Sequence, residues 1–180
     1  MDRLRLATVW LGGCSGCHMS FLDLDEWLIE LAGRADVVYS PFVDTKEYPE
    51  GVDVALVEGA VANEDNVEMI RRVRARTRVL VSFGDCAVTG NVTALRNPLG
   101  TALEVLRPVY LEHGDLHASI PQADRLVPVL LDRVRPVHAV VPVDFYLPGC
   151  PPPAARIRAV LEQVLAGTAP SLAGRDIKFG

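Results

Sequence analysis

The chain has 180 residues, of which 49% are hydrophobic and 23% are charged, which is the balance of a folded globular domain rather than of a disordered chain. Its formal net charge is −5 and its pI is about 5.3, so it lacks the basic surface that binds nucleic acid or anionic lipid. No apolar run is long enough to span a membrane, and no signal peptide or twin-arginine pair is recognisable. We therefore expect one cytoplasmic domain over residues 1–180, with its four cysteines as ligands or catalysts rather than disulfides.

Short apolar runs, each followed by a turn, predict the strands of a β-sheet. Their continuous hydrophobicity is typical of parallel strands that are covered by helices on both faces. Since these runs alternate with helical segments, we expect an α/β fold with a mainly parallel sheet. The expected strands are residues 4–11, 36–40, 53–57, 78–82 and 138–143.

Helices are predicted between these strands. Apolar residues recur at helical spacing from Phe21 to Leu31. Ser20 and Asp23 resemble a capping box at the start of this helix, and Gly33 is a stop signal at its end. The remaining segments are a helix at 63–76, a loop with at most a turn of helix at 87–100, a helix at 154–166, and residues 101–136, which have no clear period and no assigned role. Within the last range, residues 126–134 are expected to be a short helix or an irregular segment.

Each of the four cysteines follows one of the predicted strands. Cys14 and Cys17 lie in a glycine-rich turn after the first strand, Cys86 follows the fourth, and Cys150 follows the fifth. The carboxyl ends of parallel strands meet at one edge of a sheet, so we expect these four side chains to lie close together. Four thiolates in one place select a soft metal or an iron–sulfur cluster.

Three kinds of thiol site fit these spacings. A 4Fe–4S cluster takes one cysteine per iron, and one close pair with two single cysteines suits it. Structural zinc more often uses two close pairs, but a zinc-stabilised interaction module stays open as an alternative. A thioredoxin-like dithiol would use Cys14 and Cys17 at a helix start, and it leaves Cys86 and Cys150 without a role.

Other residues near the predicted site allow two interpretations each. His18 follows Cys17 and either hydrogen-bonds a cluster sulfur or a partner, or is a half-exposed residue at a helix start. Glu58 ends the third predicted strand; it either relays protons or accepts hydrogen bonds from backbone N–H groups, and we favour the second role. Trp10 and Trp27 are expected in the core or at an interface.

Four motifs follow one another over residues 4–166: Trp10 to Cys17, Val57 to Ala60, Gly84 to Gly90, and Leu147 to Pro152. Together they resemble the small subunit of nickel–iron hydrogenases, a family related to the 20-kDa-type subunit of NADH:quinone oxidoreductase. Since no cysteine follows Cys150, the chain is most similar to the short small subunit of cytoplasmic, NAD-reducing bidirectional hydrogenases.

This resemblance implies a flavodoxin-like three-layer fold and a proximal 4Fe–4S cluster held by Cys14, Cys17, Cys86 and Cys150. It implies that the nickel–iron centre lies on a separate large subunit against this edge of the sheet, so that no residue of this chain is itself catalytic. Many family members have a glutamate where this chain has Gly13, and no role of that glutamate carries over.

The resemblance also implies the partners of an enzyme that couples oxidation of H2 to reduction of NAD+. Electrons would pass between the large subunit and NAD through this cluster and then through iron–sulfur and flavin diaphorase subunits. An FMN in this subunit is compatible with the resemblance, but nothing in the sequence requires it. Within the family, the alternative is a cytoplasmic hydrogenase that serves another soluble acceptor.

Overall fold

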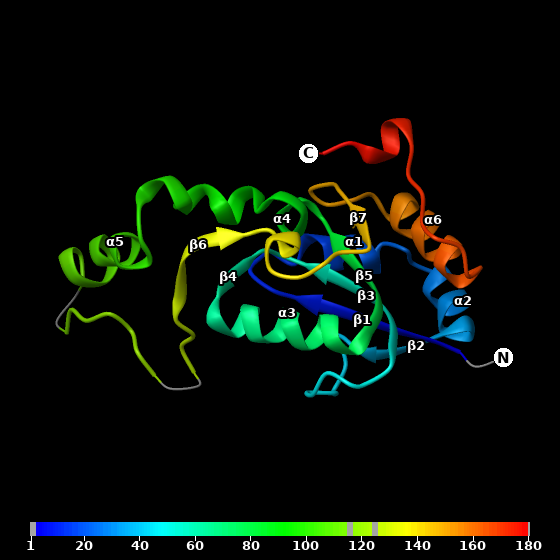
Figure 1. The fold of residues 1–180 in the computed structure, drawn as a ribbon, viewed down its shortest axis with the longest axis horizontal. Helices are drawn as coiled ribbons and strands as arrows, with labels where there is room; N and C mark the ends of the chain where they lie inside the picture. The colour runs from blue at the N-terminus through cyan, green and yellow to red at the C-terminus, as the bar shows by residue number, and fades with distance from the viewer. Residues whose placement is uncertain (1–2, 115–116, 124–125, 180) are drawn as a thin grey trace.

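A parallel β-sheet runs through the middle of the protein (Figure 1). Within residues 3–114, 117–123 and 126–179, which the computed structural model describes, this sheet has five strands in the order β2-β1-β3-β5-β7, and every neighbouring pair is parallel. This is the strand order of flavodoxin-like folds, so the predicted α/β fold is confirmed. The strands are β1 (Leu4–Trp10), β2 (Ala35–Tyr39), β3 (Val52–Glu58), β5 (Thr77–Phe83) and β7 (Phe145–Leu147).

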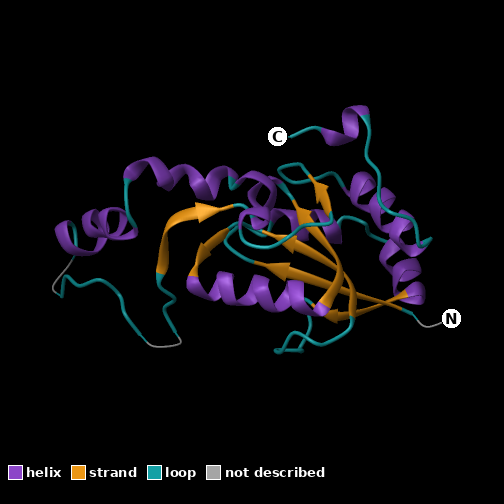
Figure 2. Ribbon diagram, viewed as in Figure 1, coloured by secondary structure: helices purple, strands orange, loops and turns teal. Residues whose placement is uncertain are grey.

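Helices cover both faces of the sheet and enclose a hydrophobic core on each (Figure 2). One core contains Phe21, Trp27 and Ile157 from three helices, and the other contains Ile70 and Val73 from a single helix. Burial of such side chains stabilises the fold by about 1.5–3 kcal/mol each. The helices are α1 (Gly16–Leu22), α2 (Trp27–Arg34) and α6 (Ala154–Leu165) on the first face, and α3 (Glu64–Arg76) on the second.

The single helix predicted from Phe21 to Leu31 is wrong, because this region forms two helices, α1 and α2. Asp25, between them, has a left-handed backbone with a φ of 49°, which breaks the helix. The predicted capping box is also absent at Ser20, which lies inside α1 and whose hydroxyl donates to the carbonyl of Pro152 at 2.6 Å. A capping box forms instead at Thr101 and Glu104.

The fifth strand lies later in the chain than predicted. Residues 138–143 are not a strand; Val137–Ala139 form a 3-10 turn, η3, and Val137 and Val141 are buried against the second core. The strand is Phe145–Leu147, and Asp144 fixes its start by accepting a hydrogen bond from the Leu80 N–H at 2.7 Å. The valines of the apolar run therefore pack against the second core rather than pairing in the sheet, and His138, Ala139 and Pro142 are exposed.

Residues 87–100 are more regular than the predicted loop. They contain the end of α4 (Asp85–Thr89) and the 3-10 helix η1 (Asn91–Leu99). Side chains hold η1 in place: Arg96 donates to the carbonyl of Leu131 at 2.6 Å, and Asn97 donates to the carbonyl of Val134 at 2.9 Å. Such contacts join segments far apart in the sequence and leave no local pattern.

The described residues within 101–136, a range that had no clear period, form a lobe beside the carboxyl edge of the sheet (Figure 1). The lobe includes a second, antiparallel pair of strands. The prediction of a short helix or an irregular segment at 126–134 is therefore wrong for the part of that range that forms one of these strands. Its elements are α5 (Ala102–Arg107), the π-helical turn η2 (Pro108–Glu112) and β6 (Leu130–Arg135), which pairs with β4 (Val61–Asn63). Outside the lobe, a 3-10 turn, η4 (Gly174–Ile177), follows α6 near the end of the chain.

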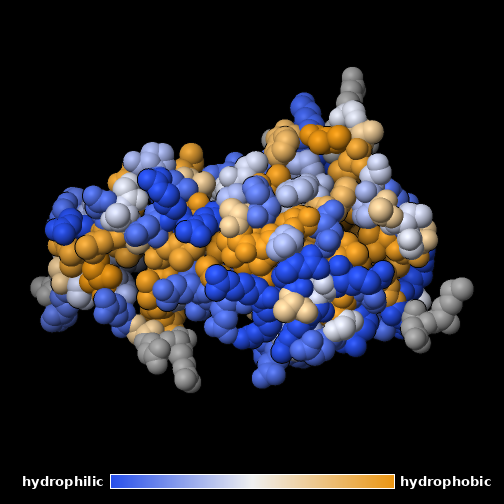
Figure 3. Space-filling model, viewed as in Figure 1, coloured by the Kyte–Doolittle hydropathy of each residue, from blue (hydrophilic) through white to orange (hydrophobic). Residues whose placement is uncertain are grey.

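Apolar side chains reach the surface over this lobe and in a band across the body (Figure 3). They include Leu103, Val109 and Val129, which are 49%, 61% and 62% exposed. Among the described residues, no helix has the length and apolar character needed to cross a membrane.

Candidate metal-cluster site

The structure brings the four cysteines to the carboxyl edge of the sheet, as predicted. Cys14 lies in the loop after β1, Cys17 in the first turn of α1, Cys86 in α4 after β5, and Cys150 in the loop after β7. All four are free thiols; Cys14 and Cys150 are exposed, whereas Cys17 is buried. Cys150 reaches this edge although its strand was misplaced, because β7 also runs parallel to its neighbour.

The thiols are close enough to influence one another electrostatically. Burial raises the pKa of the Cys17 thiol far above its ordinary value, and the charges of Glu58, Cys86, Cys14 and Cys150 raise it further. Burial also raises the pKa of Cys86, with further upward contributions from Cys14, Cys150 and Glu58. These mutual contributions place the four thiols within electrostatic range of one another at this edge.

The backbone passes unusually close to the buried thiol at Gly84. This residue has a φ of 82° and a ψ of 160°, and a Cβ atom added to it would lie 2.2 Å from the Cys17 Sγ. Gly149 has a φ of 138°, and a Cβ there would lie 2.6 Å from the Cα of Pro152. Glycine is therefore required at Gly84 for the backbone to approach the Cys17 thiol, and at Gly149 for the chain to turn back on Pro152.

Hydrogen bonds hold the cysteine loops together. The Asp85 N–H donates to the carbonyl of Gly149 at 2.9 Å, and the Gly149 N–H donates back to Asp85 Oδ1 at 2.6 Å. The Gly84 N–H donates to the carbonyl of Leu147 at 2.8 Å. These bonds fix the loops that carry Cys86 and Cys150 relative to each other.

His18 and Glu58 form a buried pair beneath this edge. Both are 1% exposed, so the half-exposed placement considered for His18 is wrong. The His18 backbone N–H donates to Glu58 Oε2 at 2.9 Å, and the imidazole Nδ1 contacts the same oxygen. The ring also packs edge-on against Phe42 and Phe83. Glu58 thus accepts a backbone N–H, as favoured from the sequence, and fixes the start of α1 to the end of β3.

The tryptophans differ in their environments. Trp27 is 5% exposed, packs in the first core and lies under the guanidinium of Arg158, 5.3 Å from its ring centroid. Trp10 is 49% exposed at the end of β1. Sequence reasoning therefore placed Trp27 correctly in the core, and Trp10 lies at the surface beside the cysteine edge.

The residues at this edge fit an iron–sulfur cluster. Thiolates are the ligands of such clusters, and backbone N–H groups and amides that donate to sulfur stabilise them. The Gly16 N–H donates to Cys14 Sγ at 3.4 Å, and Asn91 Nδ2 donates to Cys150 Sγ at 3.3 Å. Among the described residues, no group of three or more His, Cys, Asp or Glu side chains is arranged to hold a single metal ion.

Sequence reasoning missed Asp85 and Asn91 as residues of the site. Asp85 is next to a cysteine but gives no pattern of its own, because its role depends on contact with a loop 64 residues later. The Gly90-Asn91 pair is a turn signal, which indicated a bend but not the direction of the amide.

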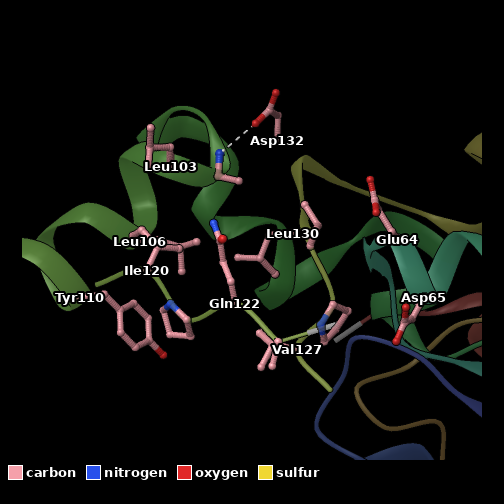
Figure 4. Close-up of a pocket in the computed structure, with 15 residues that line it drawn as sticks. Glu64, Asp65, Leu103, Leu106, Tyr110, Ile120, Gln122, Val127, Leu130 and Asp132 are labelled. Atoms are coloured by element: carbon pink, nitrogen blue, oxygen red, sulfur yellow. Dashed lines mark hydrogen bonds between the residues drawn. The ribbon is translucent and has the colours of Figure 1, made fainter. Parts of the chain in front are cut away.

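A separate cavity of about 890 Å³ lies in the lobe between α5, η2 and the start of α3 (Figure 4). Its wall is mostly apolar, and none of the four cysteines lines it. The Asp132 Oδ1 at its rim accepts a hydrogen bond from the Ala102 N–H at 3.0 Å, at the start of α5. Residues that line the cavity include Leu103, Leu106, Tyr110, Ile120, Val127 and Leu130.

Fold and site together define an α/β protein with four thiols at the carboxyl edge of a flavodoxin-like sheet. The chain belongs to the family described as NADH ubiquinone oxidoreductase, 20 Kd subunit, whose sequence profile matches residues 14–164. It is 36% identical over 171 residues to the delta subunit of the NAD-reducing hydrogenase HoxS of Cupriavidus necator, covering 92% of this chain and 80% of that protein. The hydrogenase resemblance expected from the motifs is confirmed by this relative.

Other relatives are longer, and their names do not mention NAD. The chain is 38% identical over 173 residues to a subunit of the F420-non-reducing hydrogenase of Methanococcus voltae, covering 95% of this chain and 59% of that protein. It therefore spans little more than half the length of that relative.

Solved structures show the same fold. The chain superimposes with a TM-score of 0.93 and 39% identity on a chain of a crystal structure of NAD+-reducing NiFe hydrogenase in the H2-reduced state, covering 99% and 100% of the two chains. The NiFeSe hydrogenase of Desulfomicrobium baculatum gives a TM-score of 0.59 at 18% identity, covering 98% and 68%, which shows a shared fold only.

Proposed function

We propose that this chain is the electron-transfer small subunit of a cytoplasmic nickel–iron hydrogenase, and that Cys14, Cys17, Cys86 and Cys150 hold one 4Fe–4S cluster. The observation that carries the proposal is the convergence of these four free thiols at one edge of the sheet. A single domain over residues 1–180 would supply the whole ligand set.

The bound cluster would supply one-electron exchange, and the protein would determine where that exchange occurs. Cys17 would anchor the cluster against the first core, in which its side chain is already packed. Cys14 and Cys150 would hold the outer side, since both are exposed. Electrons would therefore enter or leave at this open edge, against which a partner subunit can dock.

The proposed partners follow from the relatives. A large subunit would carry the nickel–iron centre, and iron–sulfur and flavin diaphorase subunits would carry electrons to NAD. The identity to a subunit of an NAD-reducing hydrogenase supports this acceptor. The similar identity to subunits of F420-non-reducing hydrogenases, whose names do not mention NAD, is the reason to keep the second candidate, a hydrogenase with another soluble acceptor.

Anaerobic purification of the native complex, with analysis of nickel, iron and sulfide, tests this proposal. We expect a tightly bound nickel-containing chain, at least about four irons per small subunit beyond the nickel site, and H2-dependent reduction of NAD+. Cys14→Ser and Cys150→Ser should each disrupt the cluster. Zinc without iron, sulfide or visible absorption would overturn the proposal in favour of a zinc-stabilised interaction module.

A separate result would identify a dithiol enzyme. The thioredoxin-like alternative requires that Cys14→Ser abolishes disulfide reductase activity while Cys150→Ser retains it. An intact cluster in both variants would also contradict the assigned ligand set.

A further inference from the structure

Asn91 lies where α4 gives way to η1, directly beside the fourth cysteine. Its side-chain Nδ2 donates to the Cys150 Sγ at 3.3 Å. The turn that places it is tightly specified, because Gly90 and Asn91 have successive positive φ values of 92° and 37°. Asparagine is one of the few non-glycine residues that adopt such a conformation readily. The backbone therefore directs a side-chain amide toward a cysteine 59 residues away.

The start of η1 supplies a second donor to the same edge. A hydrogen bond from the Thr93 backbone lowers the pKa of Cys86, opposing the larger effect of burial. Asn97 and Arg96 hold this helix against β6 through the carbonyls of Val134 and Leu131. The donor groups of residues 91–93 are therefore held in place on a fixed segment.

From this geometry we infer that Asn91 is a positioning residue that raises the reduction potential of the cluster by donating a hydrogen bond to the Cys150 sulfur. The inference rests on the proposed function, since it requires a cluster at this edge. One-electron reduction adds one negative charge to the cluster and its thiolates and forms or breaks no bond. An N–H donor stabilises the more negative state more strongly, because hydrogen bonds to charged acceptors are the stronger ones. Hydrogen bonds to cluster sulfurs are a known determinant of potential.

Two variants separate the hydrogen bond from the backbone conformation. Asn91→Asp keeps the size and the tolerance of a positive φ but replaces the donor amide with a carboxylate. Asn91→Gly keeps the backbone free to adopt this turn and removes the side chain. As a control, Gln163→Glu adds the same charge near the far end of α6, where Gln163 bonds to the carbonyl of Ala159.

The test is an EPR-monitored redox titration of the anaerobic complex, with iron content measured for every variant. We expect Asn91→Gly to lower the midpoint potential of the cluster. The equilibrium constant for its reduction should fall a few-fold to tenfold, where tenfold corresponds to about 59 mV for a one-electron couple. Asn91→Asp should lower it further, and Gln163→Glu should leave it unchanged.

The outcomes are distinguishable. Unchanged potentials in both Asn91 variants, with full iron content, would overturn the inference. A lower potential in Asn91→Asp alone would also overturn it, because added charge rather than the lost donor would then explain the shift. If no cluster signal of the wild-type complex is lost in Cys14→Ser, the proposed function, rather than this inference, would be overturned.

Discussion

Replacement of Gly84 by alanine tests the close packing around the buried thiol. The φ of 82° and ψ of 160° lie in a region that costs a non-glycine residue about 1–3 kcal/mol. The added Cβ would also lie 2.2 Å from the Cys17 Sγ, and relief of such overpacking typically costs about 1–3 kcal/mol more. We therefore expect Gly84→Ala to lower the free energy of unfolding by about 4 kcal/mol and to reduce the iron bound per chain.

Urea unfolding of the full chain measures the first effect, and iron analysis after anaerobic purification measures the second. Gly33→Ala is the matched control, because Gly33 lies in α2 and an added Cβ has no atom within 4 Å. This control should gain about 0.5–1 kcal/mol from the helical preference of alanine. If Gly84→Ala unfolds at the wild-type urea concentration and keeps its iron, the close approach of the backbone to Cys17 does not require glycine, and the reasoning is refuted.

Three further predictions concern the same core and edge. Glu58→Ala should leave two buried His18 donors without an acceptor, which should lower the free energy of unfolding by about 1–3 kcal/mol for each, as measured with urea. Glu58→Gln keeps an acceptor and should lower it by less than half as much. Equal losses in the two variants would contradict the role of Glu58 as the acceptor. Burial raises the pKa values of Cys17 and Cys86, so the iron-free folded chain keeps protons that the unfolded chain releases above about pH 8.5. The free energy of unfolding should therefore be constant below that pH and fall above it. Urea unfolding between pH 7 and 10 checks the sign, and a free energy of unfolding that rises with pH would refute the prediction. Trp27→Ala should cost about 3–5 kcal/mol, as measured by urea unfolding, because the ring is buried in the first core; a loss below 1 kcal/mol would contradict that burial.

Much of the sheet and the gathering of the thiols could be predicted because both depend on local patterns. Continuous apolar runs located β1, β2, β3 and β5 to within one or two residues. The edge rule for parallel strands then brought the cysteines together without knowledge of any contact. The rule tolerated even the error in the fifth strand, since β7 ends at the same edge.

The rest depended on contacts between distant segments. An apolar run such as residues 138–143 is equally compatible with a strand and with a buried loop, and its packing in the second core decided between them. The break between α1 and α2 arises from one left-handed residue, Asp25, which carries no strong stop signal. η1 is anchored by Arg96 and Asn97 to β6, so its helical form follows from tertiary contacts rather than from its own sequence.

The unequal exposure of the four thiols bears on how the protein would be assembled. Cys14 and Cys150 are open to solvent, whereas Cys17 is enclosed by the core. Iron and sulfide would therefore have to arrive from the exposed side, before another subunit docks there and blocks the route. The same opening would admit dioxygen to a cluster that has no partner over it. Docking of that subunit would thus close the exposed edge to iron, sulfide and dioxygen, and assembly of the metal site would precede formation of the complex.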